Sequence, residues 1–242
     1  MNKVNILNIP ITNTTKAQFS KKMMILLEKQ KRPIQIVTAN PEIIMLAKEN
    51  PTYEGYLRAS DHVVADGIGV VMGAKMLGTP LQERIAGYEL LLEFLSLADV
   101  EKHRFYFYGG KPGVAQKAAE EAKKRFPNAK IVGVSDGYGG DGDGVQVAEK
   151  IAKLKPTHIF VALGAPKQEE WIAEHAQRFQ HAIMMGVGGS FDVLSGQVNR
   201  APELFIRLNL EWFYRLIAQP TRAKRMLKIP QFLLAIQREK RK

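Results

Sequence analysis

Asp66 is the first residue whose surroundings could support chemistry, because it lies between the apolar run 63–65 and a segment with glycines. Partial burial among apolar residues raises the pKa of a carboxylate and suits it to act as a general base. An aspartate at such a place can also cap the following helix with its carboxylate. The residue types favour the cap and leave the base as the second hypothesis.

Polar side chains occupy similar places elsewhere. Thr38 and Asn40 follow another apolar run, and Arg84 precedes a predicted helix. The guanidinium of Arg84 could bind a phosphate through two N–H groups, although a lone arginine is more often part of a surface ion pair. Lys167 and Gln168 stand at a helix start, where unpaired N–H groups favour an anion.

Four glycine-bearing loops follow predicted strands, at residues 109–113, 136–140, 164–168 and 186–190. Ligands of open parallel sheets bind outside the carboxyl ends of the strands. Glycine allows the backbone to approach a ligand closely, and phosphates bind at helix N-termini. One such loop is most simply a tight turn, whereas four together indicate a nucleotide site.

The elements that must position these residues form an α/β pattern, because apolar runs of strand length alternate with segments of helical period. The predicted fold is therefore an α/β body with a mainly parallel sheet, Rossmann-like in its second half. Strands are expected at 4–9, 34–38, 62–65, 104–108, 131–135, 158–163 and 182–186. Helices are expected at 15–30, 41–48, 87–98, 112–125, 144–154 and 167–178.

The body is predicted to span residues 1–195, with a catalytic part at about 1–103 and a nucleotide part at about 104–195. Residues 196–242 form a helical basic amphipathic appendage, beginning with one helix at 204–217. Ten Lys and Arg against three Glu in residues 203–242 give +7 of the formal net charge of +11. The appendage could lie on an anionic membrane surface or pack on the body with a solvated basic face, and the sequence favours neither.

Other features limit the possible functions. The chain has no cysteine, so it has neither disulfides nor thiolate metal sites. No secretory signal or spanning helix is expected, which indicates the cytoplasm. The Asp141-Gly142-Asp143 pattern occurs easily by chance, and the five histidines lack metal-ligand spacing. We therefore expect no metal and no cofactor.

Eight motifs occur together in a fixed order. They are Thr38-Ala39-Asn40-Pro41, Ala65-Asp66-Gly67-Ile68-Gly69, Glu83-Arg84-Ile85-Ala86-Gly87, Phe107-Tyr108-Gly109-Gly110, Gly164-Ala165-Pro166-Lys167-Gln168-Glu169, Gly186-Val187-Gly188-Gly189 with Phe191-Asp192, Arg200-Ala201-Pro202, and Leu210-Glu211-Trp212 with Tyr214-Arg215-Leu216. From about residue 5 to residue 232 the chain resembles the WecG/TagA/CpsF family, glycosyltransferase family 26. Eight ordered motifs are far more specific than one.

The resemblance implies an inverting, metal-independent transfer of N-acetylmannosamine from UDP to undecaprenyl-pyrophosphate N-acetylglucosamine. The product would be the β-1,4 disaccharide that begins wall teichoic acid or a related polymer. It also implies that Asp66 is the base and that further catalytic positions are Thr38, Asn40, Arg84, Gln168 and the appendage arginines Arg215, Arg222 and Arg225. Together with the loops, it gives as UDP-sugar contacts Gly109, Gly110, Asp136, Tyr138, Lys167, Gln168, Gly188, Gly189 and Asp192.

Asn209, Ser195 and Gln219 depart from the family's usual residues, which leaves the donor open, with UDP-N-acetylmannosamine uronic acid as the alternative. The expected partners are the UDP-sugar, the lipid-linked acceptor and the anionic inner face of the cell membrane, where the protein would be peripheral. An oligomer in solution and a monomer at the membrane are compatible with this scheme. A basic nucleic-acid-binding protein would explain the charge but not the loops, and an oxidoreductase would lack the GxGxxG fingerprint.

Overall fold

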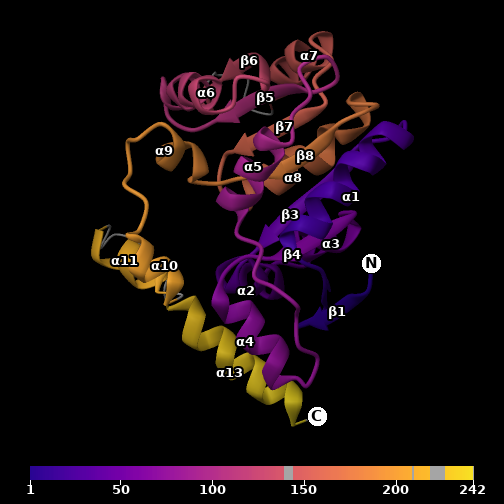
Figure 1. Cartoon of the computed structure of the whole chain (residues 1–242). Helices are drawn as coiled ribbons and strands as arrows, with labels where there is room; N and C mark the ends of the chain where they lie inside the picture. The colour runs from indigo at the N-terminus through magenta and orange to yellow at the C-terminus, as the bar shows by residue number, and fades with distance from the viewer. Residues whose placement is uncertain (139–143, 209, 219–226, 242) are drawn as a thin grey trace.

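The computed structural model describes residues 1–138, 144–208, 210–218 and 227–241, except the side chain of residue 215. The strands in these residues are β1 (Lys3–Ile6), β2 (Ile9–Thr12), β3 (Ile34–Ala39), β4 (His62–Ala65), β5 (Arg104–Gly109), β6 (Lys130–Ser135), β7 (His158–Ala162) and β8 (Ile183–Gly186). They form one sheet in the order β1-β2-β4-β3-β8-β7-β5-β6 (Figure 1). Only the β1–β2 pair is antiparallel within the described sheet. The predicted α/β fold with a mainly parallel sheet is confirmed.

One predicted strand is wrong, because residues 4–9 are not continuous. The chain turns at Leu7 and Asn8, which have φ values of 48° and 69°, so that β1 and β2 form a hairpin. Positive φ at both central residues matches the twist of a two-residue hairpin. Leucine is a rare residue at such a position, so the sequence gave no turn signal here.

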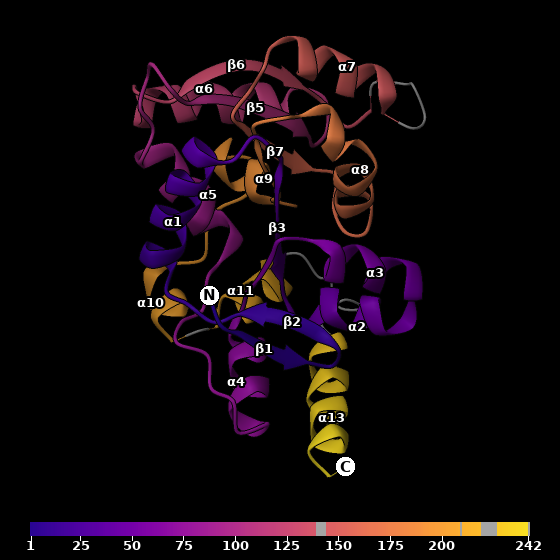
Figure 2. The same ribbon diagram turned by 90° about the vertical axis from the view of Figure 1, so that its right-hand side faces the viewer.

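Helices cover both faces of the sheet. One face carries α1 (Lys16–Lys29), α5 (Gly87–Ser96), α6 (Val114–Arg125) and the short α9 (Ser190–Leu194). The other face carries α2 (Pro41–Glu49), α3 (Pro51–Ala59), α4 (Ile68–Met76), α7 (Val145–Lys153), α8 (Lys167–His175) and α13 (Lys228–Lys240). Figure 2 shows α1 and α5 on one side of the sheet and α2, α3 and α8 on the other. A 3-10 turn, η1 (Ala176–Arg178), extends α8.

In the second half of the chain, β5 is followed by β6 on one side and by β7 on the other. Helix α6 packs with the first face of the sheet and α7 with the second. A change of direction of this kind leaves a crevice outside the carboxyl ends of the two strands, where ligands of doubly wound sheets bind. The loops that begin at Gly109 and Gly164 flank that crevice.

The C-terminal segment differs from its prediction in two ways. The expected single helix at 204–217 is wrong, because α10 (Glu203–Arg207) ends before α11 (Glu211–Ala218) begins. Pro230 was expected to break a helix, yet it lies in the first turn of α13, where its missing N–H costs no intrahelical bond. The division at residue 195 stays a prediction.

Helix α13 packs on the body. Phe232 and Ile236 are fully buried against α2 and α4. A Cβ on Gly73 of α4 would lie 2.8 Å from the Phe232 ring, so the two helices are in close contact. The apolar side of this helix is therefore part of the protein core and is not available to a membrane.

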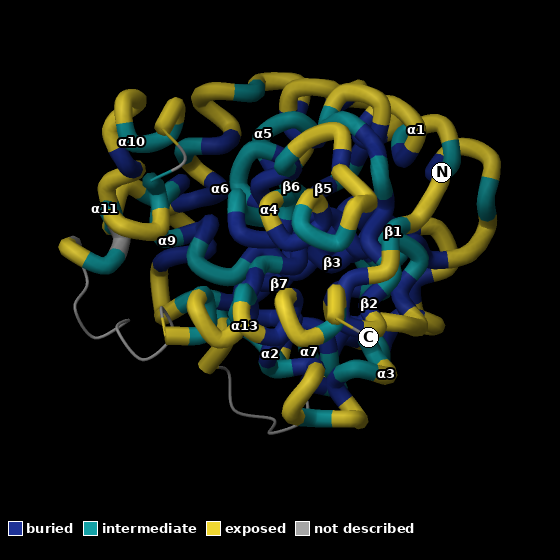
Figure 3. The backbone as a smooth tube through the Cα atoms, turned by 90° about the horizontal axis from the view of Figure 1, so that it is seen from below, coloured by how far each residue is buried: buried dark blue, intermediate teal, exposed yellow. Residues whose placement is uncertain are grey.

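The α10–α11 apolar surface is different, because its large side chains are exposed. They are Leu204, Leu208, Trp212, Phe213 and Ile217. Figure 3 shows α10 and α11 at the periphery, away from the buried strands. Among the described residues, no helix combines the length and the apolar character needed to cross a bilayer.

Candidate active site at the carboxyl edge of the sheet

Asp66 directly follows β4 and is half-buried. Its backbone N–H donates to the carbonyl of Ala39 at 2.8 Å, so β3 and β4 stay paired where both strands end. The N-cap of α4 is Gly67, with φ of 91°, and no side-chain hydrogen bond caps this helix. The carboxylate of Asp66 is therefore not the helix cap that the residue types favoured.

Asn40 lies beside Asp66 because the N-termini of α2 and α4 are in contact. Its Oδ1 accepts the backbone N–H of Ile43 at 3.0 Å and so caps α2. A Cβ on Gly69 would lie 2.7 Å from Cγ of Pro41, which explains why a residue without a side chain occupies this place. Two helix N-termini, each with a partial positive charge, therefore meet at this edge.

Thr38 is buried where β3, β8 and α5 meet. Its Oγ1 donates to the carbonyl of Gly186 at 3.4 Å. A Cβ on Gly87 at the start of α5 would lie 2.9 Å from the same oxygen. Thr38 thus joins the Asp66 side of the site to the loop that follows β8.

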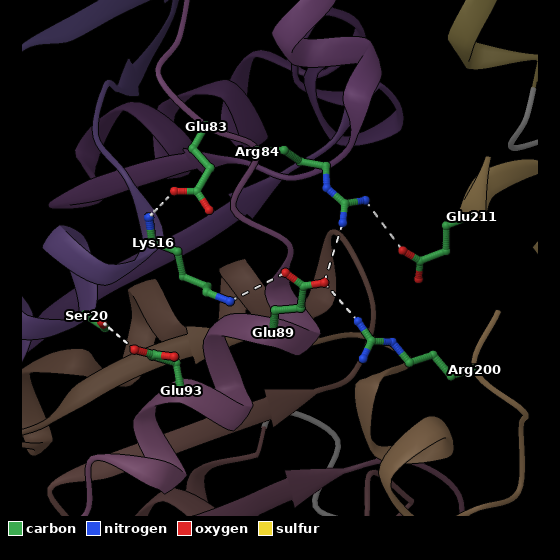
Figure 4. A network of polar contacts seen from close by, with 8 residues as sticks. All are labelled: Lys16, Ser20, Glu83, Arg84, Glu89, Glu93, Arg200 and Glu211. Atoms are coloured by element: carbon green, nitrogen blue, oxygen red, sulfur yellow. Dashed lines mark hydrogen bonds and ion pairs between the residues drawn. The ribbon is translucent and has the colours of Figure 1, made fainter. Parts of the chain in front are cut away.

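Arg84 is held near Asp66 by the loop before α5, because the N–H of Ile85 donates to the carbonyl of Ala65 at 2.8 Å. Its guanidinium lies 3.5 Å from the carboxylate of Glu89 and 3.6 Å from that of Glu211 (Figure 4). The Arg84 side chain is largely buried, so this is not a simple surface ion pair. Glu211 belongs to α11, so the C-terminal segment directly contacts a predicted site residue.

Glu89 is the centre of a cluster of charges, which we call the Glu89 cluster. Its carboxylate lies 2.8 Å from Arg200, 3.5 Å from Arg84 and 3.7 Å from Lys16. Figure 4 shows these cations approaching from different parts of the chain. The cluster links α1, α5 and the segment that leads to α10.

The glycines after β5 have a structural reason within the fold. Gly109 has φ of 114°, and a Cβ there would lie 2.6 Å from the backbone of Ala162. Gly110 donates to the carbonyl of Ala162 at 2.8 Å and accepts from the N–H of Gly137 at 2.9 Å. The loops after β5, β6 and β7 are therefore tied to one another, with Gly109 and Gly110 at the centre.

A cavity of about 460 Å³ lies between α6, the end of β6 and α7. Its polar lining includes Ser135, Asp136, Gln146 and Lys150. Asp136 accepts the backbone N–H of Tyr138 at 2.9 Å, which shapes the turn after β6. The Tyr138 side chain is 67% exposed and therefore accessible to a ligand.

Gln168 is buried at the start of α8 and fully oriented. Its Oε1 accepts the N–H of Gly188 at 3.0 Å, and its Nε2 donates to Oε1 of Glu169 at 2.7 Å. The hydroxyl of Tyr53 donates to the other oxygen of Glu169 at 3.0 Å. Burial raises the pKa of Glu169 to about 7, against the opposing effect of the two hydrogen bonds.

Sequence reasoning missed the roles of Glu169 and Tyr53. Glu169 was part of a recognised motif, so its place beside Gln168 was a usable signal. Tyr53 gave none, because it pairs with a residue 116 positions away.

The other predicted residues have simpler positions. Lys167 is exposed at the start of α8, Gly189 caps α9 and Asp192 lies half-buried on α9. Arg222, Arg225, the side chain of Arg215 and the Asp141–Asp143 pattern lie outside the described residues. In the part of the chain that is described, no group of three or more His, Asp or Glu residues could hold a metal ion.

Comparison with known proteins gives one consistent family. The model of the glycosyl transferase WecG/TagA/CpsF family matches residues 4–242. Three relatives share the name N-acetylglucosaminyldiphosphoundecaprenol N-acetyl-beta-D-mannosaminyltransferase. The Bacillus spizizenii protein is 49% identical over 206 residues, 85% of this chain and 79% of the relative. The Bacillus subtilis protein is 43% identical over 241 residues, 100% of this chain and 93% of the relative, and the Staphylococcus aureus protein is 38% identical over 99% of this chain and 94% of the relative.

Proposed function

The chain belongs to the glycosyl transferase WecG/TagA/CpsF family, and we propose that it transfers N-acetylmannosamine from UDP to undecaprenyl-pyrophosphate N-acetylglucosamine. The shared name of the relatives supports this donor sugar and this acceptor. The observation that carries the proposal is the convergence of Thr38, Asn40, Asp66 and Arg84 beside the loops after β7 and β8. The β-1,4 product would begin wall teichoic acid or a related polymer.

In the proposed reaction, an acceptor hydroxyl oxygen attacks the anomeric carbon while the bond from that carbon to the UDP oxygen breaks. The bonding electrons leave with UDP, and Asp66 takes the hydroxyl proton. A carboxylate at the site edge suits this general-base step. Arg84 and Lys167 supply positive charge for the leaving diphosphate, which stabilises the transition state. We assign the same task to Arg215, Arg222 and Arg225.

We place the UDP part along the carboxyl ends of β5 to β8. The contacts we propose are Gly109, Gly110, Asp136, Tyr138, Lys167, Gln168, Gly188, Gly189 and Asp192. The tied loops and the cavity beside Asp136 support this position. The exposed ring of Tyr138 can stack on a base, and two helix N-termini face the diphosphate.

The membrane contact belongs to the α10–α11 apolar surface in this scheme. That surface is exposed, and α11 contacts Arg84 through Glu211, so a lipid-linked acceptor bound there would have its pyrophosphate near the site. We infer a peripheral protein on the inner face of the cell membrane, active as a monomer there because one chain supplies all the proposed site residues.

Replacement of Asp66 by asparagine tests the base assignment. With UDP-N-acetylmannosamine and the lipid-linked acceptor, we expect disaccharide formation to fall by about 10²-fold or more while UDP still raises the Tm. Near-normal turnover would contradict the assignment. Parallel reactions with UDP-N-acetylglucosamine and with the uronic acid donor identify the sugar, because only the true donor gives product.

A further inference from the structure

We propose that Glu169 is a positioning residue for sugar transfer, which fixes the amide of Gln168 so that one N–H of that amide faces the donor site. The inference rests on the proposed function, because it assigns a role within the same site. It is carried by the contacts of Gln168, Glu169, Tyr53 and Gly188.

The first step concerns the cost of placing a carboxyl group here. Glu169 is only 4% exposed, and in the described part of the chain no Lys, Arg or His pairs with it. A buried carboxylate without a cation is costly unless its oxygens accept hydrogen bonds. Both oxygens do so, one from Nε2 of Gln168 and one from the hydroxyl of Tyr53. A residue that costs stability in this way points to a use other than packing.

The second step concerns what only a carboxylate can do. The two ends of a glutamine amide have nearly the same shape, so packing alone does not decide which end faces which way. An ionised carboxylate is acceptor-only and therefore selects Nε2. The N–H of Gly188 is donor-only and selects Oε1. The amide of Gln168 is therefore held between one acceptor and one donor, and a flip would break both hydrogen bonds.

The third step locates the remaining N–H group. Nε2 of Gln168 has two hydrogens, and one is used by Glu169; among the described residues the other has no partner. A Cβ on Gly186 would lie 2.5 Å from this nitrogen, so Nε2 lies against the end of β8. The carbonyl of the same Gly186 accepts from Thr38. The unused N–H is thus next to a predicted catalytic residue, where it can donate to an oxygen of the donor.

The same contacts join three parts of the site. Tyr53 comes from α3, Gln168 and Glu169 come from α8, and Gly188 comes from the loop after β8. A shift of the Gln168 amide would therefore also release the Gly188 loop. Small errors in the position of a catalytic group cost on the order of 10²-fold in rate.

The test is a double-mutant cycle on the full-length enzyme, with kcat, donor KM and Tm measured for each variant. Glu169→Leu removes the acceptor and is expected to lower kcat by about 10²-fold with a smaller change in KM. If Glu169 acts through Gln168, the Gln168→Ala variant and the Gln168→Ala/Glu169→Leu double variant are equally slow. Multiplying effects of the two replacements would overturn the proposal.

Two further variants separate positioning from stability. Glu169→Gln keeps an oxygen that can accept from Gln168 and is expected to restore most of the turnover. Tyr53→Phe removes the other hydrogen bond of Glu169, so it lowers the Tm but leaves kcat nearly unchanged. A Glu169→Gln enzyme as slow as Glu169→Leu, or a Tyr53→Phe enzyme equally slow, would contradict a role through Gln168.

If Glu169→Leu does not fold, Glu169→Met takes its place in the same cycle, because its flexible chain fills a similar space. The unmodified enzyme distinguishes the two levels of the argument. No product from any of the three donors would contradict the proposed function. Product from the unmodified enzyme together with multiplying effects would contradict the positioning role alone.

Discussion

At the scale of single residues, the site depends on groups whose partners leave them little freedom. Asn40 and Gln168 are both amides with one end already engaged, Asn40 as a helix cap and Gln168 with the Gly188 loop. Arg84 is held between Glu89 and Glu211. Side chains fixed in this way need no reorganisation when substrate binds, which is the main advantage of a preorganised site.

The burial of Glu169 predicts a change of stability with pH. Its folded-state pKa is raised from 4.5 to about 7, so the folded protein retains a proton that the unfolded chain releases. The stability from the protonated group is present below about pH 4.5 and is lost as the pH rises through about 7. Glu169→Gln needs no proton, so its stability relative to the unmodified protein should increase from pH 5 to pH 8, by on the order of 1 to 3 kcal/mol.

Urea unfolding at pH 5 and pH 8 measures this difference. Glu174→Gln is the matched control, because Glu174 is an exposed glutamate of the same helix. The control should show no dependence of its effect on pH. An equal effect of Glu169→Gln at both pH values would contradict the predicted titration.

Replacement of Arg84 by lysine tests whether charge alone is enough. Lysine keeps the charge but loses the planar fork that can bind a diphosphate through two N–H groups. We expect kcat to fall by about 10²-fold, as for the loss of one transition-state donor. Arg58→Lys is the control, since Arg58 is an exposed arginine of α3 paired with Glu54. Equal activity of the two variants would show that Arg84 acts only as a point charge.

At the scale of elements, the catalytic loops are supported from behind by α13. This helix packs against α2 and α4, whose N-termini carry Asn40 and Asp66. The close approach at Gly73 leaves no room for an added side chain. The last helix of the chain thus supports the first elements of the site.

Phe232→Ala measures that support. Removing a fully buried aromatic ring is expected to cost about 3 to 5 kcal/mol in the free energy of unfolding. Leu234→Ala, two residues along the same helix, is the control, because its side chain is 55% exposed and its loss should cost about 0.5 kcal/mol or less. Equal losses in urea unfolding would mean that α13 is not packed as described.

Most elements of the sheet could be predicted because apolar runs of strand length stand between polar turns. The failures have local causes. The β1–β2 turn uses Leu7 without a glycine signal, and α4 is apolar at most positions, so it shows no helical period. The edge where Asp66 and Asn40 meet followed from the strand ends. The Tyr53–Glu169 bond could not follow, because it depends on packing between distant helices.

At the scale of the whole molecule, basic charge and exposed apolar groups occur in the same C-terminal part of the chain. The formal net charge is +11, with an excess of +7 in residues 203–242. Charge of this sign draws a protein to anionic lipid, and apolar side chains then enter the interface.

Replacement of Leu208 and Ile217 by serine tests the membrane contact. We expect binding to vesicles that contain anionic lipid to fall by about tenfold or more, since each buried apolar side chain contributes about 1.5 to 3 kcal/mol. Leu234→Ser, an exposed leucine of α13, is the control and should bind as the unmodified protein does. Unchanged binding of the double variant, or tighter binding to duplex DNA than to vesicles at physiological salt, would contradict the membrane role.

The pairing of β3 with β8 has a consequence for biosynthesis. Thr38 bonds to Gly186, 148 residues further along, and α13 lies later still. A chain emerging from the ribosome therefore cannot close the catalytic edge until most of it has been made, because β3 lacks this neighbour until β8 appears. Nascent or prematurely terminated chains would hold Asp66 in an unfinished sheet, so they could not consume donor before synthesis is complete.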